Sequence, residues 1–276
     1  MSQTLSSRLA AMNIHYFRHS LTRFLDDAAA LGFARIELWA GMPHLSLDDA
    51  SATELRDVRR MIAARDLSLS CFTPEQCVYP INLASEHPGT ARRSFDYFRR
   101  ALHSAASLDC RQLLVTAGWG YADAPASDAW ERARDQLGAL ADEAAREGVT
   151  LLLEPLSRTE SNLITTSAEL ARMMAELASP QVAAILDLNA MAAAGETPAD
   201  YLARFGDALR HVHVCDGTPE GHLAWGDGSL PLAQYVAELE AADYQGDYSF
   251  EFVSQAYWLD PRTPLESARA AMLQAA

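Results

Sequence analysis

The sequence has little positive charge and no long apolar run. Its 22 basic residues are outnumbered by 37 acidic ones, which leaves a formal net charge of −15. A surface this acidic repels phosphate backbones and anionic lipids, so we expect neither nucleic-acid binding nor membrane-surface binding. No stretch reaches the roughly 18 consecutive apolar residues of a membrane-spanning helix, and residues 1–8 lack the apolar region of a signal peptide. We therefore expect a soluble cytoplasmic protein.

Nucleotide-binding loops and metal fingers are also missing. No G-x-G-x-x-G motif or P-loop follows a predicted strand, which argues against a doubly wound open sheet. The chain is too long for a disulfide-stabilised miniprotein, and its cysteines lack the close spacing of a zinc finger, so we expect reduced thiols. These cysteines are Cys71, Cys77, Cys110 and Cys215.

Apolar strands alternate with amphipathic helices along the whole chain. Strand patterns occur at 9–14, 35–39, 67–72, 112–116, 150–154, 182–187, 211–213 and 248–251. Helical patterns occur at 20–31, 51–65, 88–108, 127–147, 167–177, 198–205, 231–242 and 264–273. Eight strand–helix units of roughly 34 residues are typical of a (β/α)8 TIM barrel. No linker or low-complexity tract interrupts the alternation, so we predict that residues 1–276 form a single-domain barrel.

Each of the last four predicted strands ends in a residue that can bind a metal. Glu154 follows Thr150-Leu-Leu-Leu, and Asp187, His213 and Glu251 end the next three strands. The carboxyl ends of barrel strands share one face, and neighbouring strands lie about 4.8 Å apart. A single acid could instead cap the next helix or pair with a basic residue. Three carboxylates and one imidazole in succession predict a site for one divalent ion, such as Mn, Co, Ni, Mg or Zn.

A second histidine precedes His213 on the same predicted strand. His211 and His213 lie two residues apart, so their side chains face the same side of the strand. His211 would lie one layer deeper in the barrel. We expect it to be a core histidine with a satisfied hydrogen bond.

Aromatic, histidine and acidic side chains follow several other strands. Trp39 and Trp119 could form the aromatic wall of a sugar site, although plain packing is equally compatible with the sequence. His44 and His222 lie in loops on the same face, where substrate contacts are common. Glu75 could contact an amine, or it could have only a turn role. We predict all five as substrate-binding candidates.

Several motifs together resemble one enzyme family. The chain is similar to the xylose isomerase-like sugar isomerases and epimerases, most of all to the 3-epimerases that act on fructoselysine, with tagatose- and psicose-type 3-epimerases more distant. The resemblance covers nearly the whole chain. The motifs are Glu154-Pro-Leu-Ser-Arg-Thr-Glu-Ser-Asn162, Asp187-Leu-Asn189, His211-Val-His213, Phe250-Glu-Phe252, residues 36–44, Thr73-Pro-Glu75 and residues 222–228.

The resemblance implies a function and roles for particular residues. The family's metal ligands fall on Glu154, Asp187, His213 and Glu251, and a contact to a substrate hydroxyl falls on Glu160. Glu154 and Glu251 would remove and return the C3 proton of a ketose on opposite faces, through an enediolate. The implied partner is a small sugar, and a homo-oligomer remains open.

Two departures from the ketose 3-epimerase pattern bear on the substrate. Ala190 stands where those enzymes have a histidine, and Pro219 stands where they have a substrate-binding arginine. Both departures fit a different group at C1, such as the amine of a ketosamine. The alternatives are an aldose–ketose isomerase, a DNA-repair endonuclease of the same barrel family and a non-catalytic sugar-binding barrel. The endonuclease would need a histidine-rich three-metal cluster and a basic face, which this acidic sequence does not predict.

Overall fold

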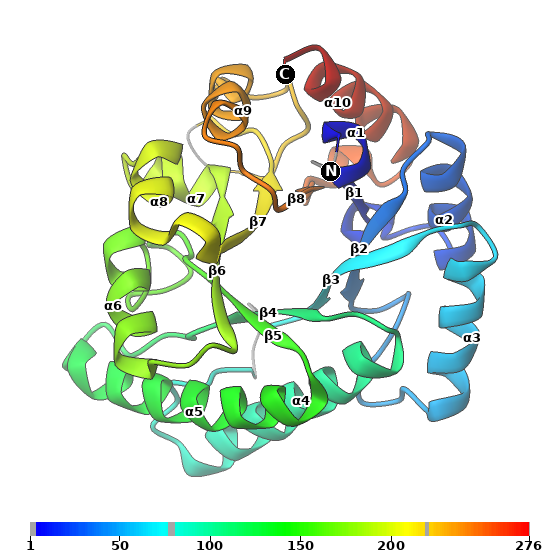
Figure 1. The fold of residues 1–276 in the computed structure, drawn as a ribbon. Helices are drawn as coiled ribbons and strands as arrows, with labels where there is room; N and C mark the ends of the chain where they lie inside the picture. The colour runs from blue at the N-terminus through cyan, green and yellow to red at the C-terminus, as the bar shows by residue number, and fades with distance from the viewer. Residues whose placement is uncertain (1–3, 77–80, 219–220, 276) are drawn as a thin grey trace.

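The computed structural model describes residues 4–76, 81–218 and 221–275. Within these residues, eight parallel strands close into one barrel in chain order, with β8 pairing back to β1 (Figure 1). The predicted (β/α)8 barrel is therefore confirmed. The strands are β1 (Leu9–Met12), β2 (Arg35–Ala40), β3 (Ser68–Pro74), β4 (Gln112–Thr116), β5 (Thr150–Glu154), β6 (Val182–Asp187), β7 (Leu209–Val214) and β8 (Asp247–Phe250).

Helices form a ring around the strands (Figure 1). The long helices match the predicted ranges to within two residues at most of their ends, and α1 and α7 were not predicted. They are α1 (Leu5–Arg8), α2 (Leu21–Ala30), α3 (Ala52–Ala63), α4 (Pro88–Ser107), α5 (Ala126–Glu147), α6 (Ser167–Leu177), α7 (Leu188–Ala193), α8 (Pro198–Phe205), α9 (Leu232–Ala241) and α10 (Arg262–Ala275). Short 3-10 turns occur at Ile14–Tyr16, Gly206–Ala208 and Gln255–Tyr257.

Local sequence signals set the helix boundaries. The Ser20 side chain accepts a hydrogen bond from Arg23 N at the start of α2, as an N-cap does. Gly32 follows the same helix with φ +78°, a conformation that costs glycine little. The helix predicted for residues 20–31 is confirmed at both ends for these reasons.

Apolar side chains form two layers. A large cluster fills the space between strands and helices, and it includes Ile36, Leu38 and Phe250. A smaller one fills the barrel interior. Its members are Cys71, Leu114, Leu152, Ala183 and Ile185. This inner cluster gives the barrel interior an apolar layer, as expected when alternate strand residues point inward.

Three cysteines are free and buried: Cys71, Cys110 and Cys215. Cys77 lies outside the described residues. Among the described residues, the structure contains no helix that is both long and apolar enough to cross a membrane.

The inner cluster provides a test of the fold. Leu152 has no exposed surface, whereas Leu259 in the loop after β8 is 87% exposed. Leu152→Ala should lower the free energy of unfolding by about 2–5 kcal/mol, because it leaves a cavity inside the barrel. The same change at Leu259 should alter it by no more than about 0.5 kcal/mol. Urea unfolding measures both values, and equal losses would contradict the described packing.

Candidate metal centre and active site

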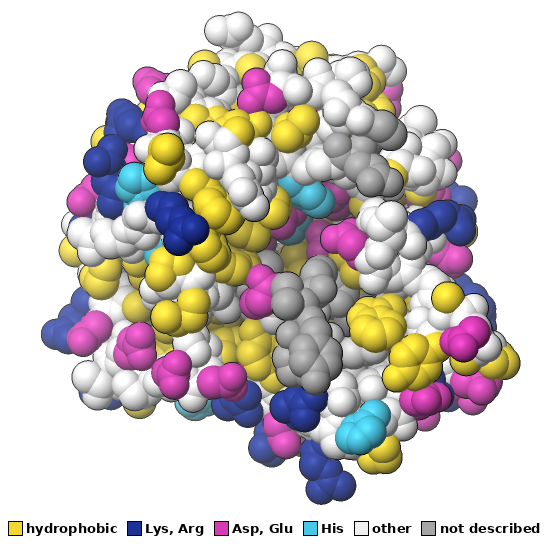
Figure 2. Space-filling model, turned by 180° about the vertical axis from the view of Figure 1, so that it is seen from behind, with side chains coloured by type: hydrophobic (Ala, Val, Ile, Leu, Met, Phe, Trp, Pro, Cys, Tyr) yellow, Lys and Arg dark blue, Asp and Glu magenta, His cyan; other side chains and the backbone are white. Residues whose placement is uncertain are grey.

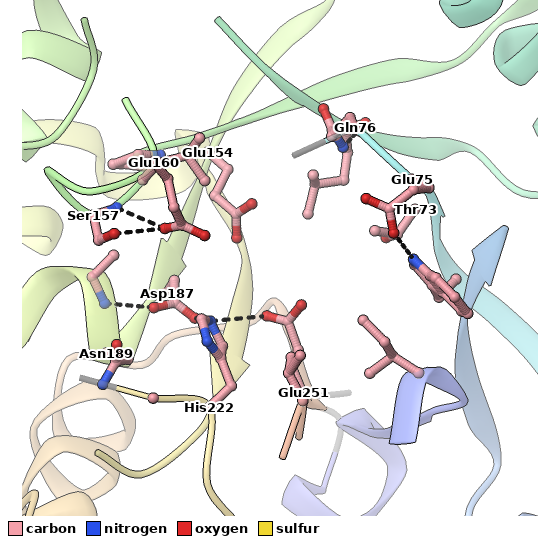
Figure 3. Close-up of a pocket in the computed structure, with 18 of the residues that line it drawn as sticks. Thr73, Glu75, Gln76, Glu154, Ser157, Glu160, Asp187, Asn189, His222 and Glu251 are labelled. Carbon is pink, nitrogen blue, oxygen red and sulfur yellow. Dashed lines mark hydrogen bonds and ion pairs between the residues drawn. The ribbon is translucent and has the colours of Figure 1, made fainter. Parts of the chain in front are cut away.

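The four predicted metal ligands converge at the carboxyl ends of the strands. One donor atom from each of Glu154, Asp187, His213 and Glu251 lies within 4.8 Å of all the others. His213 stands opposite Asp187 in the β6–β7 pairing, and Glu251 follows directly after β8. Figure 3 shows the Glu154, Asp187 and Glu251 side chains pointing into one space. The barrel has therefore brought together residues from four consecutive strands.

The His213 ring shows that this donor set fits a divalent ion. Its Nδ1 lies 3.0 Å from Glu154 Oε1 and 2.9 Å from Glu251 Oε2. The ring is buried, yet Nδ1 has no hydrogen-bond partner of acceptable geometry among the described residues. Adjacent ligands around an ion with bonds of about 2.0–2.2 Å lie about 3 Å apart. These spacings match a coordination shell better than a hydrogen-bonded pair.

The donor set contains more acidic than basic side chains. Burial raises the pKa of Glu154 to about 7. Burial disfavours a charged His213, but the carboxylates of Glu251, Glu37 and Glu154 outweigh it and raise the pKa of this imidazole well above its ordinary value. A bound cation would offset the same excess of negative charge.

Asp187 has a structural role as well. Its Oδ1 accepts a hydrogen bond from Ala190 N at 2.6 Å, so the side chain caps α7. Cys215 Sγ donates to Oδ2 at 3.2 Å. Burial opposes the charge of Asp187, but the neighbouring His222 outweighs it and lowers its pKa to about 2. These contacts hold the carboxylate in one orientation.

Sequence reasoning missed Glu37, which lies beneath the donor set. Its carboxylate is fully buried and lies 2.7 Å from His211 Nε2 and 3.1 Å from His213 Nε2. Thr73 Oγ1 also donates to it. Burial would raise the pKa of Glu37, but the two histidines hold it well below the usual range. The signal was present in the sequence, because Glu37 shares a strand face with Trp39 and the alternating Ile36 and Leu38 face the helices.

His211 is a core histidine, as predicted, and its hydrogen bond goes to Glu37. Its other ring nitrogen, Nδ1, has no hydrogen-bond partner among the described residues.

A pocket of about 380 Å³ opens over the donor set. Figure 2 shows this face from outside, hollowed at its centre, with acidic and histidine side chains inside the hollow. Four of the predicted substrate-binding residues line it: Trp39, Glu75, Glu160 and His222. Trp39 Nε1 donates to Glu75 Oε2 at 3.1 Å, and Ser157 Oγ donates to Glu160 Oε2 at 2.7 Å.

These side chains approach the pocket from different sides. His222 Nε2 lies 3.4 Å from Asp187 Oδ2 and 3.6 Å from Glu251 Oε2, next to the donor set. Glu75 and Glu160 extend from opposite sides of the space (Figure 3). A substrate held over the donor set would therefore meet acidic groups on two sides.

Two other candidates do not line this pocket. His44 is buried and bonded to Asn13 Nδ2 and to the His19 carbonyl. Trp119 is 41% exposed and borders a separate small hollow beside Asn82. Their contact with a substrate stays a prediction. Pro219, named above as a departure from the ketose 3-epimerase pattern, lies outside the described residues.

Comparisons with known proteins agree with the barrel fold. A family model described as xylose isomerase-like TIM barrel matches residues 25–275. Fructoselysine 3-epimerase of Escherichia coli O157:H7 is 28% identical over 238 residues, which cover 86% of each chain. D-psicose 3-epimerase of Enterocloster bolteae is 28% identical over 245 residues, covering 84% of this chain and 77% of that one. A solved L-ribulose 3-epimerase superposes with a TM-score of 0.84 at 23% identity, covering 98% and 94%.

Proposed function

The chain belongs to the xylose isomerase-like TIM barrel family, and from that premise we propose that it is a metal-dependent carbohydrate epimerase. It inverts C3 of a ketose or ketosamine. The observation that carries the proposal is the convergence of Glu154, Asp187, His213 and Glu251 at the floor of an open pocket. The names of the similar enzymes, 3-epimerases of fructoselysine, psicose and ribulose, support the choice of reaction.

Each residue of the donor set has a role in this proposal. Glu154, Asp187, His213 and Glu251 would hold one divalent ion, most simply Mn or Co. The ion would supply a Lewis acid that polarises the substrate ketone and so makes the hydrogen at C3 more acidic. Glu154 and Glu251 come from β5 and the end of β8, strands that are not neighbours in the barrel. One carboxylate removes the C3 proton on one face, and the other delivers a proton to the opposite face.

The composition excludes one alternative chemistry within this chain. Many enzymes activate a carbonyl through a Schiff base with a lysine amine. All 22 basic residues of this sequence are arginines, so these 276 residues provide no lysine for such a step. Proton transfer between a carboxylate and the substrate needs no amine, and the pocket provides several carboxylates.

The charge of the pocket favours a particular class of substrate. Besides the donor set, its lining includes Glu75 and Glu160, and the described lining residues include no arginine. A sugar phosphate would therefore meet no arginine here, whereas an amine would meet a carboxylate. Ala190 lines the same pocket, which leaves room where ketohexose epimerases have a histidine. We propose an unphosphorylated ketosamine that carries a positively charged amine.

Deuterium exchange tests the reaction. The manganese-loaded protein should be incubated in heavy water with a panel of ketoses and ketosamines and followed by NMR. Deuterium at C3 together with the inverted epimer is the expected result. An aldose product that carries deuterium at C2 would instead identify an aldose–ketose isomerase. Absence of exchange with every substrate would favour a non-catalytic sugar-binding barrel.

Substrate ranking tests the proposed amine contact. A ketosamine with a free amine should have a kcat/KM about 10–100-fold higher than its neutral N-acetylated analogue, because a charge-assisted hydrogen bond contributes about 1.5–3 kcal/mol. Glu75→Gln should reduce this preference and leave the turnover of fructose nearly unchanged. An equal preference in wild type and Glu75→Gln would show that Glu75 does not bind the amine. Faster turnover of fructose 6-phosphate than of the ketosamine would contradict the substrate class.

A further inference from the structure

The barrel contains a buried polar cluster directly beneath the donor set. Glu37 on β2 lies across the barrel from His211 and His213 on β7, and Thr73 on β3 completes the group. Glu37 and His211 have no exposed surface, and His213 has 1%. Among the described residues, no arginine pairs with Glu37. A buried carboxylate without a guanidinium partner is costly unless several donors bind it, so the three donors around Glu37 account for its stability.

The contacts of Glu37 determine which nitrogen of His213 carries a proton. Nε2 of this ring lies 3.1 and 3.2 Å from the two Glu37 oxygens, so Nε2 must be the donor. In the neutral ring that a metal ligand requires, Nδ1 then presents its lone pair to the space shared by Glu154 and Glu251. In the other tautomer, the lone pair on Nε2 would face the carboxylate of Glu37 and Nδ1–H would point into the donor set. Metal-binding histidines are commonly oriented by such a carboxylate on the far nitrogen.

We propose that Glu37 is a positioning residue, which holds His213 in the Nε2–H tautomer and at the ring orientation that lets Nδ1 bind a divalent ion. His211 and Thr73 hold Glu37 in place from below and from the side. This inference rests on the metal site of the proposed function. It adds a residue that touches neither the ion nor the substrate and acts only through His213.

Metal affinity provides the first test. Glu37→Gln keeps the size of the side chain and one acceptor, but it removes the charge that both histidines share. Its dissociation constant for Mn²⁺, measured by competition with a chelator, should rise about 10–100-fold, whereas that of Cys71→Ala should stay within about 3-fold of wild type. Cys71 is the matched control, because it is fully buried beside the same cluster and its Sγ lies 3.7 Å from Thr73 Oγ1. Equal affinities in wild type and Glu37→Gln would overturn the inference.

NMR provides a readout that general loosening of the barrel would not move. In zinc-loaded protein labelled with 15N-histidine, His213 should show a slowly exchanging Nε2–H proton at low field. His211→Gln removes the corresponding signal of the deeper ring and so distinguishes it from that of His213. In Glu37→Gln, this proton should move upfield, because it no longer donates to a charged acceptor. An unchanged signal would show that Glu37 does not orient the ring.

The two hypotheses fail in distinguishable ways. If wild-type protein binds neither Mn²⁺ nor Zn²⁺, the metal site itself is wrong and the proposed role of Glu37 is wrong with it. If wild type binds the ion and Glu37→Gln binds it equally well, only the role of Glu37 is wrong. Should Glu37→Gln fail to fold, Glu37→Asp serves instead. It keeps the charge but is one methylene shorter, so it should keep the Nε2–H signal and bind Mn²⁺ with intermediate affinity.

Discussion

Glu154→Gln and Glu251→Gln should each reduce net epimerisation by about 10²–10⁴-fold, because each variant loses a group that removes or delivers a proton at C3. Glutamine keeps an oxygen that can still contact the ion. The remaining carboxylate can remove and return a proton on its own face. In heavy water, Glu154→Gln should therefore introduce deuterium into one epimer and Glu251→Gln into the other, which NMR of the two purified epimers would measure.

Bound metal must be measured in both variants, because both side chains belong to the donor set. Glu266→Gln is the matched control, since that side chain on α10 is 60% exposed and far from the proposed chemistry. If both active-site variants retain the ion and label the same epimer equally, the assignment of one carboxylate to each face is wrong. If either variant epimerises at nearly the wild-type rate, the glutamate that it replaces serves only as a metal ligand.

Removing the ion should abolish activity, and adding Mn²⁺ or Co²⁺ should restore it. The donor set concentrates three buried or nearly buried carboxylates around one imidazole, so the protein without the ion keeps unrelieved repulsion. Ion at 100 times its dissociation constant stabilises the folded state by about 2.7 kcal/mol, which for a chain of this size raises Tm by about 5–10 °C. Calorimetry with and without a chelator measures the shift.

Full activity of a preparation shown to be free of metal would contradict the proposed chemistry. Calcium is a useful control, because it prefers more oxygen ligands at longer distances than this donor set provides. If calcium restores activity as well as manganese does, the ion has a purely structural role.

The donor set could be predicted from the sequence because every member lies at the carboxyl end of an apolar strand or one residue from it. The carboxyl ends of the strands in a parallel barrel share one face, so polar residues at these ends of the sequence pattern are expected to lie close together in space. Glu37 lies in the middle of a strand, and His211, which it contacts, is 174 residues away along the chain. Strand alternation indicates that Glu37 points inward, but it does not indicate which side chain it meets across the barrel.

The loop residues show a second limit of sequence reasoning. Trp39 lies near the end of β2 and Trp119 follows β4, but only Trp39 lines the pocket. Trp39 is held in place because Asn13 bonds both its backbone N–H and its backbone carbonyl. Local sequence gives no direction for a loop side chain, so the direction of Trp119 could not be predicted, whereas strand alternation places Trp39 on the inward face with Glu37. Helix α7 is not predicted from the sequence. The helix has only six residues, and its N-cap, Asp187, is interpreted from the sequence pattern as a metal ligand.

The double role of Asp187 restricts how this position can evolve. One oxygen caps α7 through Ala190 N, and the carboxylate also belongs to the donor set. Asparagine would preserve the cap but remove the negative charge, whereas glutamate would preserve the charge but is a poor cap with a longer reach. No single replacement satisfies both constraints. A lineage that abandons the present chemistry could therefore replace Asp187 by another capping residue such as asparagine, but not by a residue that leaves Ala190 N without an acceptor, so selection for folding restricts this position even where selection for activity has relaxed.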